Sequence, residues 1–268
     1  MRTPIETEAI GNPVNPAIFF VSGWAMPKEV FHGVARHLSR DFYVVIANLP
    51  GVSADPDWHK RNRFGPNYDI DALAEQLIRS APKPCWWVGW SLGGMIANYI
   101  AARRSSCVEG VITIASSAKF VASDSWVSGM ERETFEQFSQ LVAQMPEKGF
   151  KRFLALQSQG AKEERIVSKR LLSFQPKELI DPEALSRGLG LLSDLDVRRE
   201  IELLDVPNLH MFGAQDPLVS CAKTIAEFPS NPLQTVISLP ECSHQPFIED
   251  EPQFVAMVQQ YINEHSVR

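Results

Sequence analysis

Residues 85–95 read CWWVGWSLGGM, and this stretch decides the fold because it joins a strand pattern to a helix pattern through one serine. The apolar run at 85–88 predicts a buried strand, and residues 93–102 follow a helical pattern. Gly89, Ser91 and Gly93 match G-x-S-x-G, a sharp strand-to-helix turn known as a nucleophile elbow. The stretch therefore predicts an α/β fold in which Ser91 is a nucleophile.

The two glycines explain how such a turn is possible. A side chain at Gly89 or Gly93 would crowd the neighbouring backbone, and its absence lets Ser91 adopt a strained conformation that exposes its hydroxyl. The helix that begins there also favours negative charge near its N-terminus. We therefore expect the chemistry to take place at this turn.

Strand and helix patterns alternate on both sides of the elbow. Apolar runs bounded by turn residues predict strands at 18–21, 43–47, 85–88, 108–115, 209–212 and 235–239. Helical patterns at 29–38, 70–79, 93–102, 222–227 and 252–263 fall between most of them. This order predicts a mostly parallel, doubly wound sheet and, with the elbow, the α/β-hydrolase fold.

The alternation stops in the middle of the chain. Residues 118–204 read as consecutive amphipathic helices, with turn breaks at Pro146, Gly160, Pro176 and Pro182. We expect an α/β core at 1–117 and 205–268, with 118–204 inserted as a helical cap. An insertion that leaves the strand at 108–115 would lie over the carboxyl ends of the strands, where sites form in open α/β sheets.

Composition excludes several classes of protein. Of 268 residues, 44% are hydrophobic and 22% charged, which is typical of a soluble globular protein. The net charge of −6 argues against general nucleic-acid binding. Four scattered cysteines show no metal-ligand spacing, and no export signal or run of 18 apolar residues is present. We expect a cytoplasmic protein with reduced thiols, no metal, no cofactor and no membrane or nucleic-acid partner.

The chain supplies partners for Ser91 in the order serine, acid, histidine that such folds use. His244 follows the last predicted strand and precedes the final helix, so we expect it to be the general base. Asp216 follows the strand at 209–212 and is the expected acid, whereas the alternatives Asp194 and Asp205 lie before that strand. The other histidines fall on helices, in a polar loop, inside a strand or at the tail: His32, His37, His59, His210 and His265.

When a serine such as Ser91 attacks an ester, the carbonyl oxygen becomes an oxyanion, which two backbone N–H groups must stabilise. Leu92, directly after the nucleophile, is expected to supply one of them. Trp24, in the loop after the first predicted strand, is expected to supply the other while its indole lines the pocket. The alternative is that Trp24 only packs.

At this point several segments resemble one family. These are GWSLGG at 89–94, SGW at 22–24, RFLALQ at 152–157 and IASS at 114–117. Together they are similar to the bacterial pimeloyl-[acyl-carrier protein] methyl ester esterases of biotin synthesis, over nearly the whole chain. The resemblance implies a serine carboxylesterase that forms an acyl-enzyme, with Ser91, Asp216 and His244 catalytic and Trp24 and Leu92 at the oxyanion.

The resemblance also implies a partner, the acidic acyl-carrier protein that bears the pimeloyl methyl ester. Family positions that hold this carrier correspond to Lys148, Arg152, Arg165 and Lys169, and the position that lines the acyl channel corresponds to Phe153. The composition agrees, because residues 148–170 contain seven basic and two acidic side chains in an otherwise acidic protein. The alternative is a merely solvated basic surface. We expect a monomer.

Some positions depart from the family. Ser22 stands where histidine is frequent, Asn48 stands where aspartate is frequent, and the loop at 55–68 is longer and more polar. These departures concern the support of the pocket and leave the predicted triad unchanged. The competing functions are a general short-chain carboxylesterase, an acyl transferase and a non-catalytic ligand-binding hydrolase fold.

Overall fold

Seven strands form one sheet in the computed structural model, which describes residues 5–53, 67–174 and 181–266. The strand order is β1-β3-β2-β4-β5-β6-β7. The strands are β1 (Thr7–Ile10), β2 (Ala17–Val21), β3 (Tyr43–Ala47), β4 (Cys85–Trp90), β5 (Val108–Ile114), β6 (Asn208–Gly213) and β7 (Gln234–Leu239). All neighbours from β3 to β7 pair in parallel, which confirms the predicted α/β class and the mostly parallel sheet.

The first strand is antiparallel and was not predicted. β1 pairs with β3 at the edge of the sheet, and its residues alternate between exposed and half-buried. An edge strand of this kind has no continuous apolar run, whereas every residue of β2 and β4 is buried. The pattern that identified the central strands was therefore missing at 7–10.

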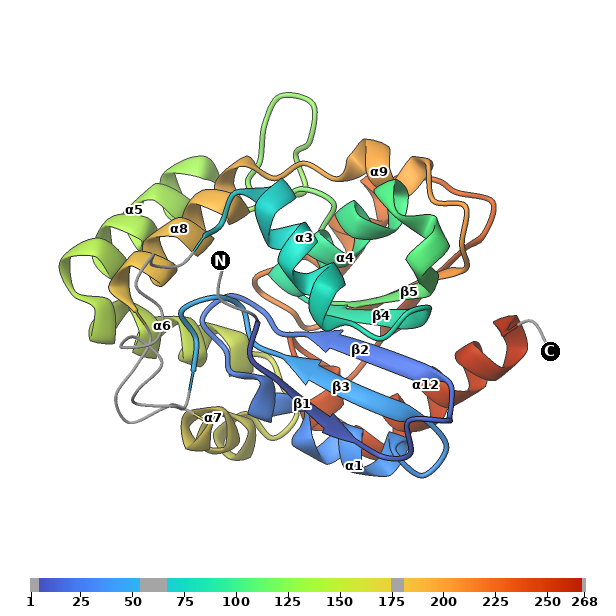
Figure 1. Cartoon of the computed structure of the whole chain (residues 1–268). Helices are drawn as coiled ribbons and strands as arrows, with labels where there is room; N and C mark the ends of the chain where they lie inside the picture. Colours follow the sequence, from blue (N-terminus) through green and yellow to red (C-terminus); the bar gives the residue numbers. More distant parts are fainter. Residues whose placement is uncertain (1–4, 54–66, 175–180, 267–268) are drawn as a thin grey trace.

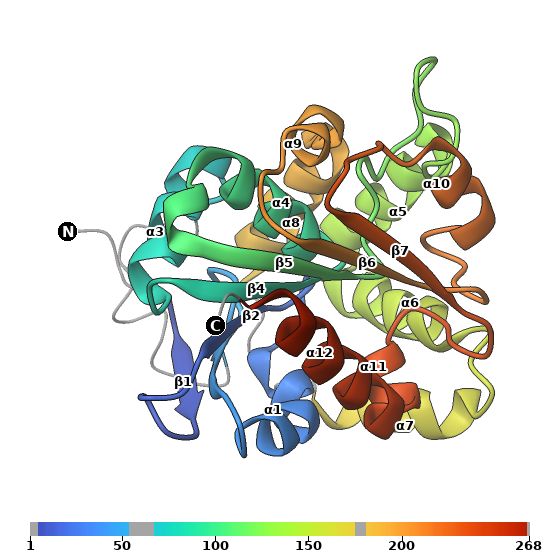
Figure 2. The same ribbon diagram turned by 90° about the vertical axis from the view of Figure 1, so that its right-hand side faces the viewer.

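Helices cover both faces of the sheet (Figures 1 and 2). On one face lie α1 (His32–Leu38) and α12 (Glu251–His265), and on the other lie α3 (Ile70–Ser80) and α4 (Leu92–Arg103). The predicted helix at 29–38 begins as a 3-10 turn, η1 (Lys28–Phe31). A second turn, η2 (Ser105–Cys107), precedes β5, and α10 (Cys221–Glu227) follows β6.

In the described part of the chain five helices lie between β5 and β6. They are α5 (Arg132–Gln144), α6 (Pro146–Ser158), α7 (Glu164–Ser173), α8 (Pro182–Asp194) and α9 (Arg198–Glu202). Pro146 and Pro182 are the first residues of their helices, where the missing N–H costs nothing. Gly160 lies between α6 and α7 at a φ of +86°, and the predicted break at Pro176 lies outside the described residues.

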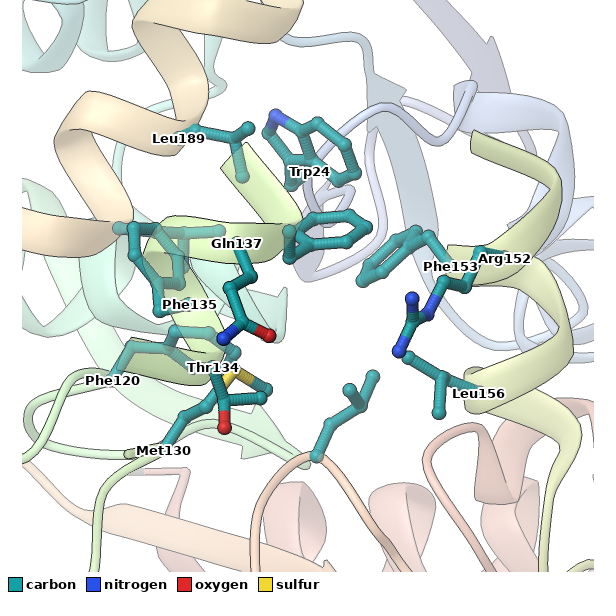
Figure 3. A pocket seen from close by; sticks show the side chains of 13 residues that line it. Trp24, Phe120, Met130, Thr134, Phe135, Gln137, Arg152, Phe153, Leu156 and Leu189 are labelled. Carbon is teal, nitrogen blue, oxygen red and sulfur yellow. The ribbon is translucent and has the colours of Figure 1, made fainter. Parts of the chain in front are cut away.

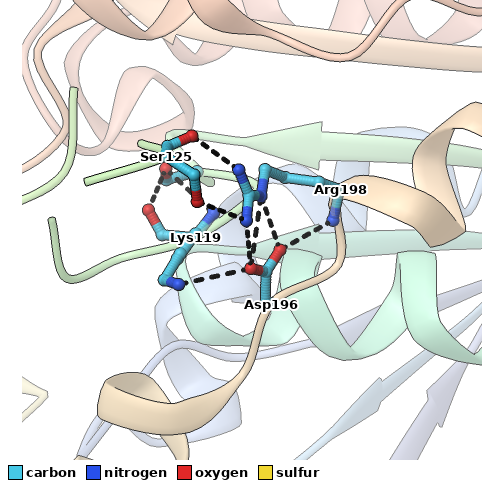
Figure 4. A network of polar contacts seen from close by, with 5 residues as sticks. Lys119, Ser125, Asp196 and Arg198 are labelled. Carbon is cyan, nitrogen blue, oxygen red and sulfur yellow. Dashed lines mark hydrogen bonds and ion pairs between the residues drawn. The ribbon is translucent and has the colours of Figure 1, made fainter. Parts of the chain in front are cut away.

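An ionic cluster holds the segment between β5 and α5 in place (Figure 4). Asp196 accepts a hydrogen bond from Lys119 Nζ at 3.3 Å and from Arg198 Nη2 at 2.7 Å. Arg198 also donates to the Ser125 carbonyl at 2.7 Å and lies over the buried Trp126 ring. The cluster therefore joins residues 119–126 to the chain just before α9.

Candidate active site

Ser91 lies between β4 and α4 with φ 54° and ψ −119°, a conformation that residues with a side chain rarely adopt. The turn is held because Ser91 N donates to the Ile114 carbonyl at 2.9 Å and the Ser91 carbonyl accepts from Gly94 N at 3.0 Å. A Cβ on Gly89 would overlap the Gly93 backbone, so the tight turn requires glycine there. Although Ser91 is the N-cap of α4, its side chain makes no capping bond, which leaves the hydroxyl available.

The structure brings Asp216 and His244 together from the ends of β6 and β7. His244 Nδ1 lies 2.7 Å from Asp216 Oδ2, and both side chains are almost fully buried. Asp216 Oδ1 accepts from the backbone N–H groups of Leu218 at 2.8 Å and Val219 at 3.1 Å. Because the carboxylate is held on both oxygens, it favours the tautomer with a proton on Nδ1 and leaves Nε2 as an acceptor. Within the described residues His244 Nε2 is buried and has no hydrogen-bond partner.

The alternative acids lie elsewhere. Asp194 is the last residue of α8 and Asp205 precedes β6, and both are exposed. Neither makes a hydrogen bond to His244 in the described part of the chain. The geometry favours Asp216 over both.

Ser91 is joined to His244 through its neighbour Trp90. Trp90 Nε1 donates to the His244 carbonyl at 2.8 Å, and the two rings lie 5.6 Å apart. No hydrogen bond between Ser91 and His244 is present in the described residues, so the structure brings together the acid and the base but does not complete the predicted triad. Catalytic hydrogen bonds of this kind are often long before substrate binds.

The predicted oxyanion residues lie beside the elbow. A Cβ on Gly23 would be 3.3 Å from Ser91 Cβ, so the loop after β2 passes directly over the serine. The backbone N–H groups of Trp24 and Leu92 have no acceptor among the described residues. Two unpaired donors next to a serine are what an oxyanion requires.

Two of the departures from the family, Ser22 and Asn48, make hydrogen bonds that hold this loop. Ser22 Oγ donates to the Ala47 carbonyl at 3.4 Å, and Asn48 Oδ1 accepts from Lys28 N at 2.6 Å. The loop is thus bonded to the end of β3. The third departure, at 55–68, lies outside the described residues except for its last two.

A cluster of charges around the buried Lys28, behind the same loop, was not predicted. Lys28 Nζ, only 5% exposed as a residue, binds Glu6 Oε1 at 2.8 Å and Glu29 Oε1 at 2.7 Å. Burial alone would lower the pKa of Lys28, but hydrogen bonds to the two carboxylates raise it. No sequence signal marks the cluster, because Glu6 and Lys28 are 22 residues apart and meet only in the folded sheet.

A largely apolar pocket adjoins the site (Figure 3). Trp24 packs edge-on against Phe153 at 4.8 Å and against Phe138 at 5.7 Å, and its Nε1 donates to the Leu185 carbonyl of α8. Trp24 therefore packs in the pocket wall while its backbone remains beside Ser91. Ser91 and His244 are not part of the lining, but Leu218, whose N–H binds Asp216, is.

The predicted carrier contacts are exposed on α6 and α7. Within the described residues none of them takes part in an ion pair: Lys148, Arg152, Arg165 and Lys169. By contrast, Lys162 is paired with Glu241 and Arg170 with Glu251, each at 2.9 Å. Arg152 also lines the pocket, where its guanidinium group lies near Leu156 (Figure 3).

The residues beside His244 are bonded to the end of α6, a link that was not predicted. Ser243 Oγ donates to the Gln159 carbonyl at 2.6 Å, and Gln245 Nε2 donates to the Gln157 carbonyl at 2.8 Å. Gln157 ends the RFLALQ segment, which the resemblance had singled out without giving this residue a role.

Neither a metal site nor a membrane-spanning helix is present in the described residues. No group of three or more histidine, cysteine, aspartate or glutamate side chains there is placed to hold a metal ion. In the same residues no helix is both long enough and apolar enough to span a membrane.

Comparison with known proteins places this geometry in context. The model of the alpha/beta hydrolase family matches residues 18–258. A pimeloyl-[acyl-carrier protein] methyl ester esterase of Aeromonas salmonicida is 33% identical over 92% of this chain and 95% of its own length. The enzyme of the same name from Vibrio parahaemolyticus is 30% identical over 97% of this chain and 99% of its own. These relatives confirm the resemblance found in the sequence.

Solved structures share the fold at lower identity. An esterase from Exiguobacterium antarcticum matches with a TM-score of 0.82 at 16% identity, covering 97% of this chain and 95% of that one. A bromoperoxidase from Bacillus anthracis matches with a TM-score of 0.79, also at 16% identity, covering 97% of this chain and 96% of that one. At this identity the likeness concerns the fold alone.

Proposed function

This chain belongs to the alpha/beta hydrolase family and is a carboxylic ester hydrolase, and from that premise we propose that it cleaves the methyl ester of pimeloyl-acyl-carrier protein in biotin synthesis. The observation that carries the proposal is the set of exposed cations on α6 and α7, without ion-pair partners among the described residues, of which Arg152 also lines an apolar pocket. An acidic carrier would be attracted to these cations, and an acyl chain would be buried in the pocket.

In the proposed mechanism Ser91 Oγ attacks the ester carbonyl while His244 Nε2 accepts its proton. Asp216 stabilises the imidazolium that forms, and the N–H groups of Trp24 and Leu92 stabilise the oxyanion. Collapse of the tetrahedral intermediate returns the proton to the departing methanol and leaves an acyl-enzyme. Water, deprotonated by His244, then releases the free carboxyl group and Ser91.

The remaining expectations form part of the same proposal. The core is 1–117 with 205–268, the cap is 118–204, and the protein is a cytoplasmic monomer that needs no cofactor. The hydrogen bond from Trp24 to Leu185 supports a cap that lies over the carboxyl ends of the strands.

The test is hydrolysis of a pimeloyl-carrier-protein methyl ester beside a short-chain p-nitrophenyl ester, with wild type and Ser91→Ala. Efficient, Ser91-dependent cleavage of the carrier-linked ester would support the proposal. Cleavage of the small ester alone would indicate a general short-chain carboxylesterase. Transfer of the acyl group to another acceptor would appear in product analysis, and inactivity on both esters would favour a non-catalytic ligand-binding fold.

A further inference from the structure

One carboxylate binds the backbone on both sides of His244. Glu249 is the last residue of the short helix α11 (Pro246–Glu249), which begins two residues after His244. Ser243 N donates to Glu249 Oε1 at 3.0 Å and to Oε2 at 2.9 Å, and Gln245 N donates to Oε1 at 3.2 Å. The two neighbours of the histidine therefore share a single acceptor group.

The electrostatic surroundings of this carboxylate include the proposed acid–base pair. Burial raises the pKa of Glu249 most, the hydrogen bonds from Ser243 and Gln245 lower it, the charge of Asp216 raises it and His244 lowers it. Within the described residues Glu249 has no lysine or arginine partner, so the backbone N–H groups are its compensating contacts. Hydrogen bonds to an ionised group are shorter and stronger than neutral ones.

Apart from the contact between His244 and Asp216, the other side-chain contacts of this turn are neutral. The Ser243 and Gln245 side chains bind carbonyls at the end of α6, and the His244 carbonyl accepts from Trp90. Asp216 binds the imidazole itself, whereas Glu249 is the carboxylate that, in the described part of the chain, accepts from the backbone N–H groups on both sides of it. A turn that precedes a four-residue helix has few helical hydrogen bonds of its own to define it.

We propose that Glu249 is a positioning residue, which fixes the turn at 243–245 so that the His244 ring meets Asp216 and keeps Nε2 available for Ser91. The inference rests on the proposed function, because it takes His244 to be the base. A catalytic group displaced by about 1 Å can lose on the order of 10²-fold in rate, so a loosened turn should reduce catalysis without removing any reacting group.

The test compares Glu249→Ala, Glu249→Gln and a control, Glu251→Ala, on p-nitrophenyl butyrate, a small ester that needs no carrier. Glu251 is a nearby, mostly buried carboxylate that pairs with His37 and Arg170 instead of the histidine turn. We expect Glu249→Ala to lower kcat by about 10- to 100-fold with little change in KM. Glu249→Gln keeps one acceptor oxygen and should fall between wild type and alanine. Glu251→Ala should keep wild-type kcat.

Two readouts separate positioning from general destabilisation. The rate at which a fluorophosphonate modifies Ser91 should fall in parallel with kcat. The low-field proton resonance of His244 Nδ1–H bonded to Asp216 should broaden or disappear in Glu249→Ala. Neither should change in Glu251→Ala, even if both variants melt at a lower temperature than wild type.

Wild-type kcat in Glu249→Ala would overturn the proposal, as would equal losses in the Glu249 and Glu251 variants. If Glu249→Ala does not fold, Glu249→Gln carries the test, and wild-type kcat and Ser91 reactivity in that variant would also overturn it. Failure of the proposed Ser91–His244 mechanism looks different: Ser91→Ala would then retain activity on this ester, whereas failure of the substrate assignment would appear as cleavage of this ester but not of the carrier-linked one. An inactive Ser91→Ala together with a fully active Glu249→Ala would reject only the positioning role.

Discussion

Trp24 Nε1 donates a hydrogen bond to the Leu185 carbonyl, 2.9 Å away, and so joins the loop beside Ser91 to helix α8 of the proposed cap. The same indole packs against Phe153 in the pocket wall. One side chain thus links the loop proposed to stabilise the oxyanion to the helices proposed to bind the substrate.

Trp24→Phe tests this link. The variant keeps an aromatic ring in the wall and the backbone N–H at position 24, but it loses the indole donor. A neutral hydrogen bond contributes about 1 kcal/mol, so thermal unfolding should show a small loss of stability. We expect kcat on a small ester to change by less than about tenfold, because the oxyanion donor is a backbone group that remains. A loss as large as that of Ser91→Ala would contradict this division of roles.

Asp216→Asn tests the proposed acid. One Asp216 oxygen binds two backbone N–H groups while the other binds His244, and asparagine has only one oxygen to accept them all. The variant must therefore lose either the hydrogen bonds from the backbone N–H groups or the one that holds the His244 tautomer with a proton on Nδ1. We expect kcat to fall by roughly 10⁴-fold. Steady-state kinetics would measure the loss, and Asp205→Asn, at an exposed alternative position, should retain wild-type kcat.

Lys169→Glu and Lys162→Glu form a matched pair for the carrier surface. Both lysines are exposed, but of the two only Lys162 has an ion-pair partner among the described residues, namely Glu241. Lys169→Glu should raise KM for the carrier-linked ester about tenfold at low salt, and added salt should reduce the difference. Neither variant should alter hydrolysis of a p-nitrophenyl ester. Equal effects of the two on the carrier-linked reaction would indicate a general charge effect in place of a docking site.

Asp196→Asn tests the cluster that holds the segment 119–126. Burial alone would raise the pKa of Asp196, but hydrogen bonds from Arg198 and Lys119 hold it below its ordinary value. A carboxylate with a lowered pKa in the folded protein stabilises it at pH above the unfolded value of about 3.9 and loses that effect as pH falls through the folded pKa. Asp196→Asn should therefore melt below wild type at pH 7, and the difference should shrink below pH 4.

The same variant should affect the pocket, because Phe120 and Met130 in its lining belong to or follow the segment that the cluster holds. We expect KM to rise more for p-nitrophenyl octanoate than for the acetate. An unchanged ratio of the two KM values would show that the cluster stabilises the fold without shaping the pocket.

Local patterns predicted the central strands and most core helices because each depends on neighbouring residues. β2 and β4 are buried along their whole length, so continuous apolar runs marked them. The elbow could be recognised in the sequence because the glycines that its tight turn requires lie within four residues of Ser91. The edge strand β1 was not visible, because alternation over four residues is a weak signal.

What the sequence by itself determined is the class of fold, the elbow at Ser91 and the order of serine, aspartate and histidine. Each of these can be recognised from a few neighbouring residues and their chemical types. Only the tertiary structure decided that Asp216 reaches His244, that Trp90 binds a carbonyl 154 residues away, and that Asp196 and Lys28 form ionic clusters. These contacts depend on which strands lie side by side in the sheet and on how the helices pack against it. That arrangement follows from the burial of the whole core and not from any single segment.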